Sequence, residues 1–253
     1  MIMKMLHSTA MMRLFILLIL AVHTAAAITM SLYPNSVDEE FEFEDCKKEM
    51  YRRITNHSLN EELNNNAKFK KAWDEAKKDL ILGRKENSNL TQDELRKIAL
   101  RVYTGTDVYR ELNDKMREGR GTYKTGFGLI SLHFLITDGI QTRNAEQHLQ
   151  RDCRTTYRRT NITIEITDPF VRFGSFASSS VKTTLTHFGN ETCFIITTCY
   201  GADISMKSKY DQEVEVLIPP YEVFINETVT ANKAPNCTRV YQLRSVGKIS
   251  TMK

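Results

Sequence analysis

The spacing of hydrophobic residues predicts helices in the first part of the chain. In residues 67–82, Phe69, Trp73, Ala76 and Leu80 recur at intervals of three and four, which places them on one stripe of an amphipathic helix. Mostly charged residues occupy the other positions. Trp73, the only tryptophan of the chain, is therefore expected in the core.

Two further segments have helical patterns. Residues 91–104 begin with a capping box, in which Thr91 caps the helix and Glu94, three residues later, returns the hydrogen bond. Residues 129–140 are apolar on nearly every side, which predicts a buried helix. We expect His133, within that helix, to be a core residue or a helix-face residue rather than a catalytic base.

Beyond about Cys153 the pattern changes to that of β-strands. Residues 160–167 alternate strictly, with Ile162, Ile164 and Ile166 expected on one face. Short runs rich in β-branched and aromatic residues follow, separated by Gly, Asn and Pro; they are residues 192–200, 214–220, 221–226 and 239–243. Helices first and strands afterwards predict an α+β fold rather than an alternating one.

Length and charge add two constraints. The chain has 253 residues and no internal repeat, so we expect a single domain over residues 28–253, helical over about 37–150 and β-rich over about 153–246. The formal net charge of +4 is small and spread out, which argues against a nucleic-acid partner.

The first residues have the pattern of a signal peptide. Lys4 and Arg13 precede an apolar run over residues 14–22, and Ala25 and Ala27 then occupy small-residue cleavage positions. The run is too short for a stable membrane span. We expect residues 1–27 to be removed after about Ala27; the alternative is an uncleaved N-terminal anchor.

Export agrees with the remaining composition. The C-terminal residues 241–253 contain no hydrophobic tail of the kind that a lipid-anchor signal needs, so we expect a soluble, secreted, extracellular protein without a stable membrane anchor. Sequons for N-glycosylation occur at Asn56, Asn89, Asn161, Asn190 and Asn226. A sixth, at Asn236, is the weakest because Cys237 is its middle residue.

Two carboxylates in the strand-rich part are candidate catalytic groups. Glu213 and Glu215 are expected on one face of a strand, roughly 6–7 Å apart, with Val214 and Val216 facing the core. At an effective dielectric constant near 20, like charges at that distance repel by roughly 2 kcal/mol, which separates their pKa values and permits two roles. The alternative is a strand with one solvated polar face.

Two other stretches carry candidate ligand-binding side chains. Arg158 follows Tyr157 at the end of a short strand segment, where a planar guanidinium can bind a phosphate or diphosphate. The alternative is a surface basic cluster with Arg151, Arg154 and Arg159. Ser178 belongs to the serine cluster of residues 173–180, whose hydroxyls can orient a neighbouring acid or ligand; the alternative is a serine-rich loop.

Taken together and in this order, the three stretches resemble the arginine-specific ecto-ADP-ribosyltransferases of vertebrates, which carry an R-S-E×E signature on three segments of a β-rich core. Arg158 in YRRT matches the Arg, Ser178 in FASSS the Ser, and Glu213 and Glu215 in EVEVLIPPYEVF the E×E strand. AWDEA, SLHFLIT, TCYGADI and the stretch 109–117 are also family-like. The resemblance covers nearly the whole mature chain and implies a helical half packed on a mainly antiparallel β-core.

The resemblance also implies a reaction, the transfer of ADP-ribose from NAD⁺ to an arginine guanidinium with release of nicotinamide. Arg158 would hold the diphosphate and Glu215 the nicotinamide ribose, with Ser178 positioning Glu215. Glu213 would bind the acceptor guanidinium and help to deprotonate it, and Tyr210 is a candidate acceptor contact. NADP⁺ is a further possible co-substrate, and no metal is expected.

Two departures from the family pattern concern the neighbours of the site residues. Arg159 stands where the family often has Gly, and this larger residue is expected to change the loop beside Arg158 and thereby the affinity for NAD⁺. Ala177 and Ser179 replace threonines that are common around Ser178, and we expect these changes to be tolerated.

The five cysteines of an exported chain imply disulfides. On the family's template, Cys46 would pair with Cys237, and Cys153 with Cys199. Cys193 is the alternative partner of Cys153 and otherwise the remaining, buried thiol.

Two alternatives to transfer remain. One is an NAD⁺ glycohydrolase, in which water replaces the arginine acceptor; the other is a secreted protein that keeps the fold but acts by binding alone. The expected partners are target proteins with an accessible arginine, and we expect a monomer.

Overall fold

The computed structural model describes residues 27–37, 46–81, 89–105, 108–147, 152–205, 207–229 and 236–249. The expected signal peptide, apart from its last residue, lies outside these ranges. No helix within them is long and apolar enough to span a membrane.

Seven α-helices are found in the described part of the first half of the chain. They are α2 (Lys47–Arg53), α3 (Leu59–Asn65), α4 (Ala67–Leu80), α5 (Gln92–Tyr103), α6 (Tyr109–Glu118), α7 (Tyr123–Gly126) and α8 (Ile130–Glu146). The predicted capping box is present at the start of α5, where Thr91 and Glu94 bond each other's backbone N–H. The three helices expected from the sequence are thereby confirmed as α4, α5 and α8.

The second half forms one large sheet with strand order β4-β9-β10-β6-β2-β5-β8-β7. Its strands are β2 (Arg154–Thr160), β4 (Phe170–Val171), β5 (Ala177–Ser180), β6 (Thr192–Thr198), β7 (Ala202–Asp203), β8 (Glu215–Ile218), β9 (Glu222–Glu227) and β10 (Arg239–Lys248). All neighbouring pairs are antiparallel except β10 with β6. The predicted α+β fold with a mainly antiparallel sheet is confirmed.

A small second sheet corrects one strand prediction. It pairs β1 (Ile28–Met30) in parallel with β3 (Ile164–Ile166). Ile162, expected on the same face as Ile164, lies outside the strand and is 49% exposed. The chain bends there, because the backbone N–H of Ile162 bonds the Thr160 hydroxyl instead of continuing a ladder.

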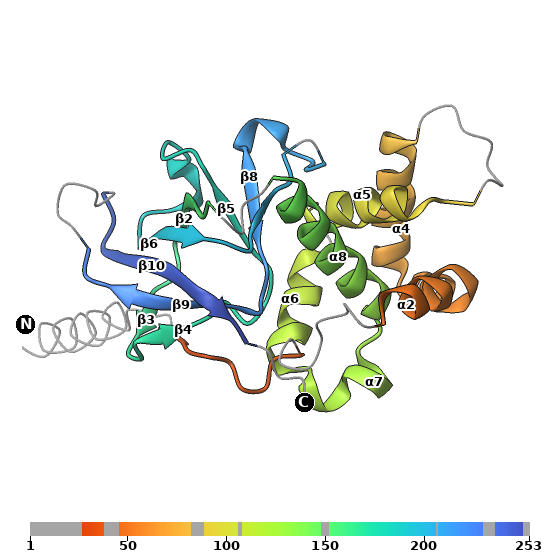
Figure 1. The fold of residues 1–253 in the computed structure, drawn as a ribbon, viewed down its shortest axis with the longest axis horizontal. Helices are drawn as coiled ribbons and strands as arrows, with labels where there is room; N and C mark the ends of the chain where they lie inside the picture. Colours follow the sequence, from red (N-terminus) through yellow and green to blue (C-terminus); the bar gives the residue numbers. More distant parts are fainter. Residues whose placement is uncertain are drawn as a thin grey trace, which may run out of the picture.

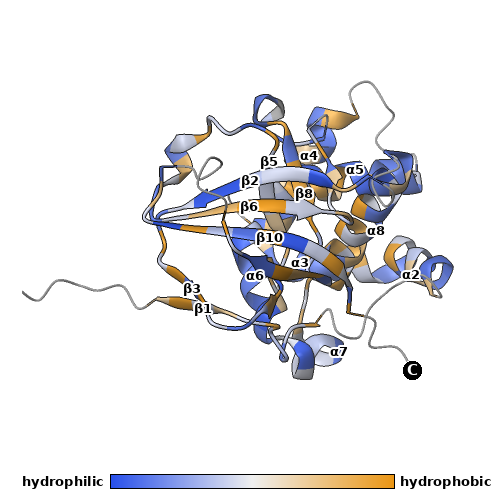
Figure 2. Ribbon diagram, turned by 60° about the vertical axis from the view of Figure 1, so that its left-hand side comes forward, coloured by the Kyte–Doolittle hydropathy of each residue, from blue (hydrophilic) through white to orange (hydrophobic). Residues whose placement is uncertain are grey.

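Helices and sheet form two layers that share a hydrophobic core. Figure 1 shows the helices on one side of the molecule and the sheet on the other, with β8 next to α8. The core between the layers combines α8 residues such as Leu132 and Leu135 with Phe176, Ile204 and Leu217 from the sheet side. In Figure 2, hydrophobic colour follows α8 and β6, whereas β2 is largely hydrophilic. That polar strand is the one that carries Arg158.

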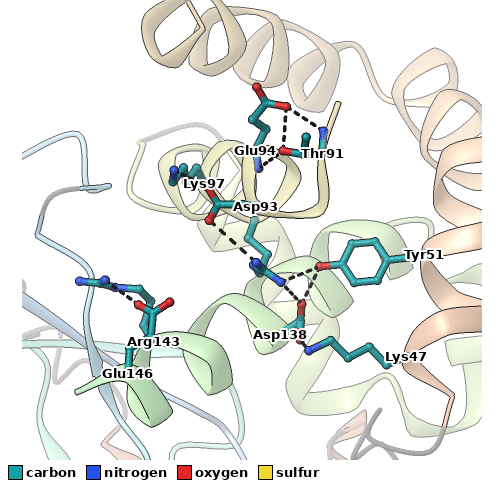
Figure 3. Close-up of polar contacts among 10 residues, drawn as sticks. Lys47, Tyr51, Thr91, Asp93, Glu94, Lys97, Asp138, Arg143 and Glu146 are labelled. Atoms are coloured by element: carbon teal, nitrogen blue, oxygen red, sulfur yellow. Dashed lines mark hydrogen bonds and ion pairs between the residues drawn. The ribbon is translucent and has the colours of Figure 1, made fainter. Parts of the chain in front are cut away.

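Asp138 of α8 joins three helices from a buried position. Its side chain is only 1% exposed, and its Oδ2 accepts hydrogen bonds from the Tyr51 hydroxyl at 2.5 Å and from Arg96 Nη1 at 3.1 Å. Lys47 forms an ion pair with the other oxygen (Figure 3). Because Lys47 and Tyr51 belong to α2 and Arg96 to α5, this carboxylate ties both helices to α8.

One predicted disulfide is confirmed. Cys153, just before β2, bonds Cys199, just after β6. The two strands are antiparallel neighbours with Arg154 opposite Thr198, so the sheet register itself brings these cysteines together.

The second predicted disulfide is wrong. Cys237 bonds Cys193, so Cys193 is not the remaining thiol, and Cys46 takes part in neither bond. Cys237 lies just before β10, which runs parallel to β6 with Val240 opposite Cys193. The exposed Cys46 precedes α2, which Figure 1 shows on the far side of the molecule from the start of β10.

Candidate active site

Three adjacent strands bring the candidate site residues together. Arg158 lies on β2, Ser178 on β5 and Glu215 at the start of β8, and these strands are consecutive in the sheet order. Ser180 is opposite Tyr157 of β2 and Glu215 of β8, so the register sets the three segments side by side. The fourth candidate, Glu213, comes from the short 3₁₀ turn η5 (Asp211–Glu213) that precedes β8.

The four predicted residues all line one pocket. With its open mouth the pocket encloses about 470 Å³ of empty space, and its walls comprise Tyr157, Arg158, Arg159, Ser178, Ser179, Ser180, Lys182, Leu185, Phe188, Glu213 and Glu215. The pocket is thus an open concavity with a guanidinium and two carboxylates in its wall.

Sequence analysis missed three of these wall residues. Lys182, Leu185 and Phe188 come from the segment between β5 and β6, and the Phe188 side chain is 44% exposed. No periodic pattern identifies them, because the segment is irregular apart from the short 3₁₀ turn η4 (Thr186–Phe188). An aromatic residue in a polar loop after the serine cluster was the available signal.

The relation between the two glutamates differs from the prediction. They do not share a strand, because β8 begins at Glu215 and Glu213 belongs to η5. Val214 between them has φ +46°, a left-handed conformation that is rare for a β-branched residue. The turn at Val214, rather than strand alternation, therefore sets how the two carboxylates face the pocket. The Ser180 hydroxyl donates to the Glu213 carbonyl and holds this turn.

Glu215 is a buried carboxylate in a mixed electrostatic environment. It is 5% exposed, and burial raises its pKa above the ordinary value. Hydrogen bonds from the Ser178 and Ser208 hydroxyls and the charge of Arg158 oppose that rise, whereas the nearby Glu213 adds to it. Ser178 therefore lies within hydrogen-bonding reach of Glu215, and its role in positioning that carboxylate stays a prediction.

Arg158 is a half-buried cation fixed by the strand beside it. Its Nη1 donates to the Ser178 carbonyl at 2.6 Å. Burial lowers its pKa, and the tyrosines Tyr103 and Tyr109 together with Glu215 oppose that shift. An arginine remains charged despite such a shift, so the pocket keeps a permanent positive charge.

The helical layer supplies the groups behind the pocket. Tyr103 of α5 is buried, its hydroxyl donates to the Phe176 carbonyl at 3.0 Å, and Asn113 of α6 donates to that hydroxyl at 3.1 Å. These helical residues were not identified as site neighbours from the sequence, since their spacing only indicates an apolar helix face.

Ser208 is a further neighbour of Glu215 that sequence analysis missed. Its hydroxyl donates to Glu215 Oε2 at 2.8 Å from a loop seven residues earlier. Tyr210, a candidate acceptor contact, is 45% exposed in the same loop. Arg159, the departure from the family pattern, lines the pocket and donates from Nη1 to the sulfur of Cys237 at 3.3 Å.

Comparison with known proteins identifies the family. The sequence profile of the NAD:arginine ADP-ribosyltransferases matches residues 30–251, which is most of the chain. The chain therefore belongs to this family.

Several relatives are similar over much of their length. The chain is 34% identical to T-cell ecto-ADP-ribosyltransferase 1 of Mus musculus over 211 residues, which are 79% of this chain and 69% of that protein. It is 37% identical to the GPI-linked NAD(P)(+)--arginine ADP-ribosyltransferase 1 of Homo sapiens over 61% of this chain and 49% of that protein. The chain thus spans between about half and two thirds of the length of these relatives.

The solved structures agree with this assignment. The eucaryotic mono-ADP-ribosyltransferase ART2.2 is similar to this chain with a TM-score of 0.68 and 28% identity, over 87% of this chain and 95% of that one. A variant of ART2.2 in complex with NAD is similar with a TM-score of 0.67 and 28% identity, over 86% of this chain and 94% of that one.

Proposed function

We propose that the protein is a secreted NAD⁺:protein-arginine mono-ADP-ribosyltransferase. One observation carries the proposal: Glu213 and Glu215, a carboxylate pair, line the same pocket as Arg158 and Ser178. The relatives named as arginine ADP-ribosyltransferases and the NAD complex of ART2.2 support the choice of substrates.

The donor set of the pocket fits NAD⁺. Arg158 is a half-buried cation with further N–H donors besides the one bonded to Ser178, so it can hold the negative diphosphate with its planar fork. Glu215, already fixed by two serine hydroxyls, would accept from a ribose hydroxyl. Among the described residues, no group of three or more His, Cys, Asp or Glu could hold a metal ion. NADP⁺ is included as a further donor because two relatives carry NAD(P)(+) in their names.

The two carboxylates have separate tasks in the proposed reaction. As the bond between ribose C1′ and nicotinamide breaks, nicotinamide leaves with the electron pair and positive charge develops on the ribose. Glu215 stabilises that charge because it is fixed before the reaction begins. Glu213 orients the acceptor guanidinium and takes the proton that it loses as its nitrogen bonds to C1′. Its half-buried position at the pocket leaves it accessible to an incoming side chain.

The site favours transfer over hydrolysis because both carboxylates are present. Water needs no carboxylate to orient a guanidinium, so a glycohydrolase could dispense with Glu213. A protein that only binds would not require Glu215 to be held by two hydroxyls, since that arrangement serves a charge that develops during reaction.

The first experiment supplies the secreted protein with labelled NAD⁺ and agmatine, a small guanidino acceptor, and quantifies ADP-ribosyl-agmatine and nicotinamide together. We expect both products from the natural protein. Glu213→Gln should lose transfer by roughly 100-fold or more while retaining some nicotinamide release, because the loss of a general base typically costs about 10²–10⁴-fold. Nicotinamide without acceptor product would assign a glycohydrolase, and neither product would assign a binding protein.

Secretion and glycosylation form part of the same proposal. Five of the six sequon asparagines, Asn56, Asn89, Asn161, Asn190 and Asn236, are exposed, whereas Asn226 is half-buried in β9. Relatives named ecto-enzymes support an extracellular location. The proposed protein is a single-domain monomer over residues 28–253 that modifies accessible arginines of target proteins.

A further inference from the structure

A buried hydroxyl outside the signature residues bonds the candidate catalytic carboxylate. Ser208 is 2% exposed and Glu215 5% exposed, and the Ser208 hydroxyl donates to Glu215 Oε2 at 2.8 Å. The same oxygen of Ser208 accepts from the backbone N–H of Tyr210 at 3.1 Å. Because that N–H occupies the acceptor side of the hydroxyl, its one proton is directed at the carboxylate.

The backbone of Ser208 is held by the helical layer. Its carbonyl accepts from Nη1 of Arg101 on α5 at 2.6 Å, and the next N–H, that of Lys209, bonds the Thr104 hydroxyl at 2.8 Å. Arg101 is itself bonded to Asp79 of α4 at 3.0 Å. The end of α5 therefore fixes the position of the loop that presents the hydroxyl.

Glu215 is thus held from two independent directions. Ser178 reaches it from the neighbouring strand β5, whereas Ser208 reaches it from a loop whose place depends on α5. A carboxylate that must stabilise developing charge performs best when its orientation is fixed in advance.

We infer that Ser208 is a second positioning residue for Glu215, and that Arg101 of α5 and Thr104, the residue that follows this helix, hold it in place. The inference rests on the proposed function, since it assigns Ser208 to the catalytic step of the same site. It connects the helical layer, which contributes none of the signature residues, to the chemistry of the pocket.

The pKa of Glu215 distinguishes a positioning role of Ser208 from a role in loop stability alone. Only a hydroxyl that bonds the carboxylate changes that pKa when it is removed. The groups that face Glu215 are Glu213 from the preceding turn, Arg158 from β2 and the Tyr103 hydroxyl from α5. The Ser208 hydrogen bond lowers the pKa of Glu215 against the effect of burial. Removing this bond raises that pKa further, so the acid limb of the pH–rate profile moves to higher pH.

The test compares Ser208→Ala with Ser208→Thr, which keeps a hydroxyl, and with Ser205→Ala in the same loop. Ser205 is the matched control because its hydroxyl bonds Asp203 instead of Glu215. With NAD⁺ and agmatine, we expect Ser208→Ala to lower kcat by roughly 10- to 100-fold, the scale of a misplaced catalytic group, with little change in KM for NAD⁺. The acid limb of the pH–rate profile of Ser208→Ala should shift to higher pH. Ser208→Thr should recover most of the kcat and most of this shift, and Ser205→Ala should match the natural protein in both.

A second variant tests the role of α5. Arg101→Met removes the bond to the Ser208 carbonyl but keeps the aliphatic stem, and we expect a smaller loss of kcat in the same direction. Combined with Ser208→Ala it should add little, because both changes act through one contact. Fully additive losses would overturn the role assigned to Arg101.

A measurement without turnover separates this inference from the proposed function. The pKa of Glu215 is followed by carbon-13 NMR of its carboxyl group, assigned by its absence in Glu215→Gln, in the natural protein and in folded Ser208→Ala. A higher pKa in Ser208→Ala supports the inference even if no transfer is observed. An unchanged pKa together with an unchanged kcat overturns it even if the protein is an active transferase.

Discussion

At the scale of single residues, Val214 sets the geometry of the site. A β-branched side chain at φ +46° is strained, and such strain costs on the order of 1–3 kcal/mol when the surrounding structure imposes it. Here the constraint comes from the Ser180 bond to the Glu213 carbonyl on one side and the β8 ladder on the other. Val214 is strained because the two glutamates on either side of it both line the same pocket.

Replacing Val214 with Gly should therefore separate stability from activity. Glycine relieves the left-handed strain but costs about 0.5–1 kcal/mol through the greater entropy of the unfolded chain, so we expect the free energy of unfolding to stay the same or to rise by up to about 2 kcal/mol. The turnover number with agmatine should fall, because the relative orientation of Glu213 and Glu215 is no longer fixed. Urea denaturation and the transfer assay measure the two quantities.

The matched control is Val216→Gly, two residues further along. Val216 is fully buried within β8, so its loss should cost roughly 2–4 kcal/mol through a cavity and a weakened strand. If Val214→Gly proves equally destabilising, Val214 is an ordinary packing residue and the strain argument fails.

The residue scale also explains an error of the sequence prediction. Alternation of glutamate and valine predicts one strand with both carboxylates on one face, and periodicity carries no information about a left-handed residue that is not Gly or Asn. The presence of Arg158, Ser178, Glu213 and Glu215 in one pocket was predictable, because their order along the chain matches the family signature. Their mutual orientation was not, because it depends on φ at Val214.

At the scale of elements, the Asp138 contacts hold the helical layer together. A buried carboxylate with an arginine, a lysine and a tyrosine around it is a network rather than an exposed ion pair. Burial raises the pKa of Tyr51 as the largest cause, and the hydrogen bond to Asp138 adds to it, so the phenol stays protonated and continues to donate. The network thus orders α2 and α5 on α8 independently of the active site.

Asp138→Asn should destabilise the fold by roughly 3–5 kcal/mol, the usual cost of removing one partner from a buried ion pair. Arg96 and Lys47 would lose their shared counter-charge, and the carboxamide would present a donor where Tyr51 needs an acceptor. Thermal and urea denaturation measure the loss, while kcat per folded molecule should remain near that of the natural protein.

Asp93→Asn is the control for that substitution. Asp93 also contacts Arg96, at 3.8 Å, but its side chain is 56% exposed, so we expect a loss below about 1 kcal/mol. A comparable loss for both variants would mean that charge number rather than burial governs this layer.

Local sequence patterns predict the bounds of the helices but not the positions of the loops. The predicted helix over residues 67–82 is present as Ala67–Leu80, and the helix over 91–104 as Gln92–Tyr103, because apolar spacing and an N-cap are local signals. The loops that place Phe188 at the pocket and Ser208 against Glu215 have no such signal. The position of the Ser208 loop, for example, follows from its contacts with the remote end of α5.

At the scale of the whole molecule, contacts between residues far apart in the sequence settle features that the sequence alone does not predict. Cys237 could pair with any other cysteine on composition alone, and only the parallel packing of β10 on β6 brings it to Cys193.

The hydrogen bonds of Glu222 are a second contact between distant strands. Glu222 is the first residue of β9, but its Oε2 accepts from the Thr198 hydroxyl at 2.5 Å, and its Oε1 accepts from the backbone N–H of Cys199 at 2.7 Å. The carboxyl thereby joins β9 to the end of β6, although β10 lies between these strands in the sheet.

This buried carboxyl predicts a pH dependence of stability. Glu222 is fully buried, and burial raises its pKa from 4.5 to about 7 despite its hydrogen bonds. The folded state then binds a proton that the unfolded state releases, so the stabilisation is complete below about pH 4.5 and is lost as pH rises through about 7. The difference between these two pKa values corresponds to roughly 3 kcal/mol in the free energy of unfolding.

Glu222→Gln tests the sign as well as the size of this effect. Glutamine resembles the protonated carboxyl, keeping one acceptor for the Cys199 N–H and a donor that the Thr198 hydroxyl can accept. Glu62, whose pKa burial likewise raises to about 7, contributes a slope of the same sign in both proteins and cancels in the comparison. We therefore expect the variant to match the natural protein in acid and to exceed its free energy of unfolding above neutral pH, as measured by urea denaturation across that range. If the natural protein instead becomes more stable than the variant as pH rises, the ionised carboxylate is the form that joins β9 to β6.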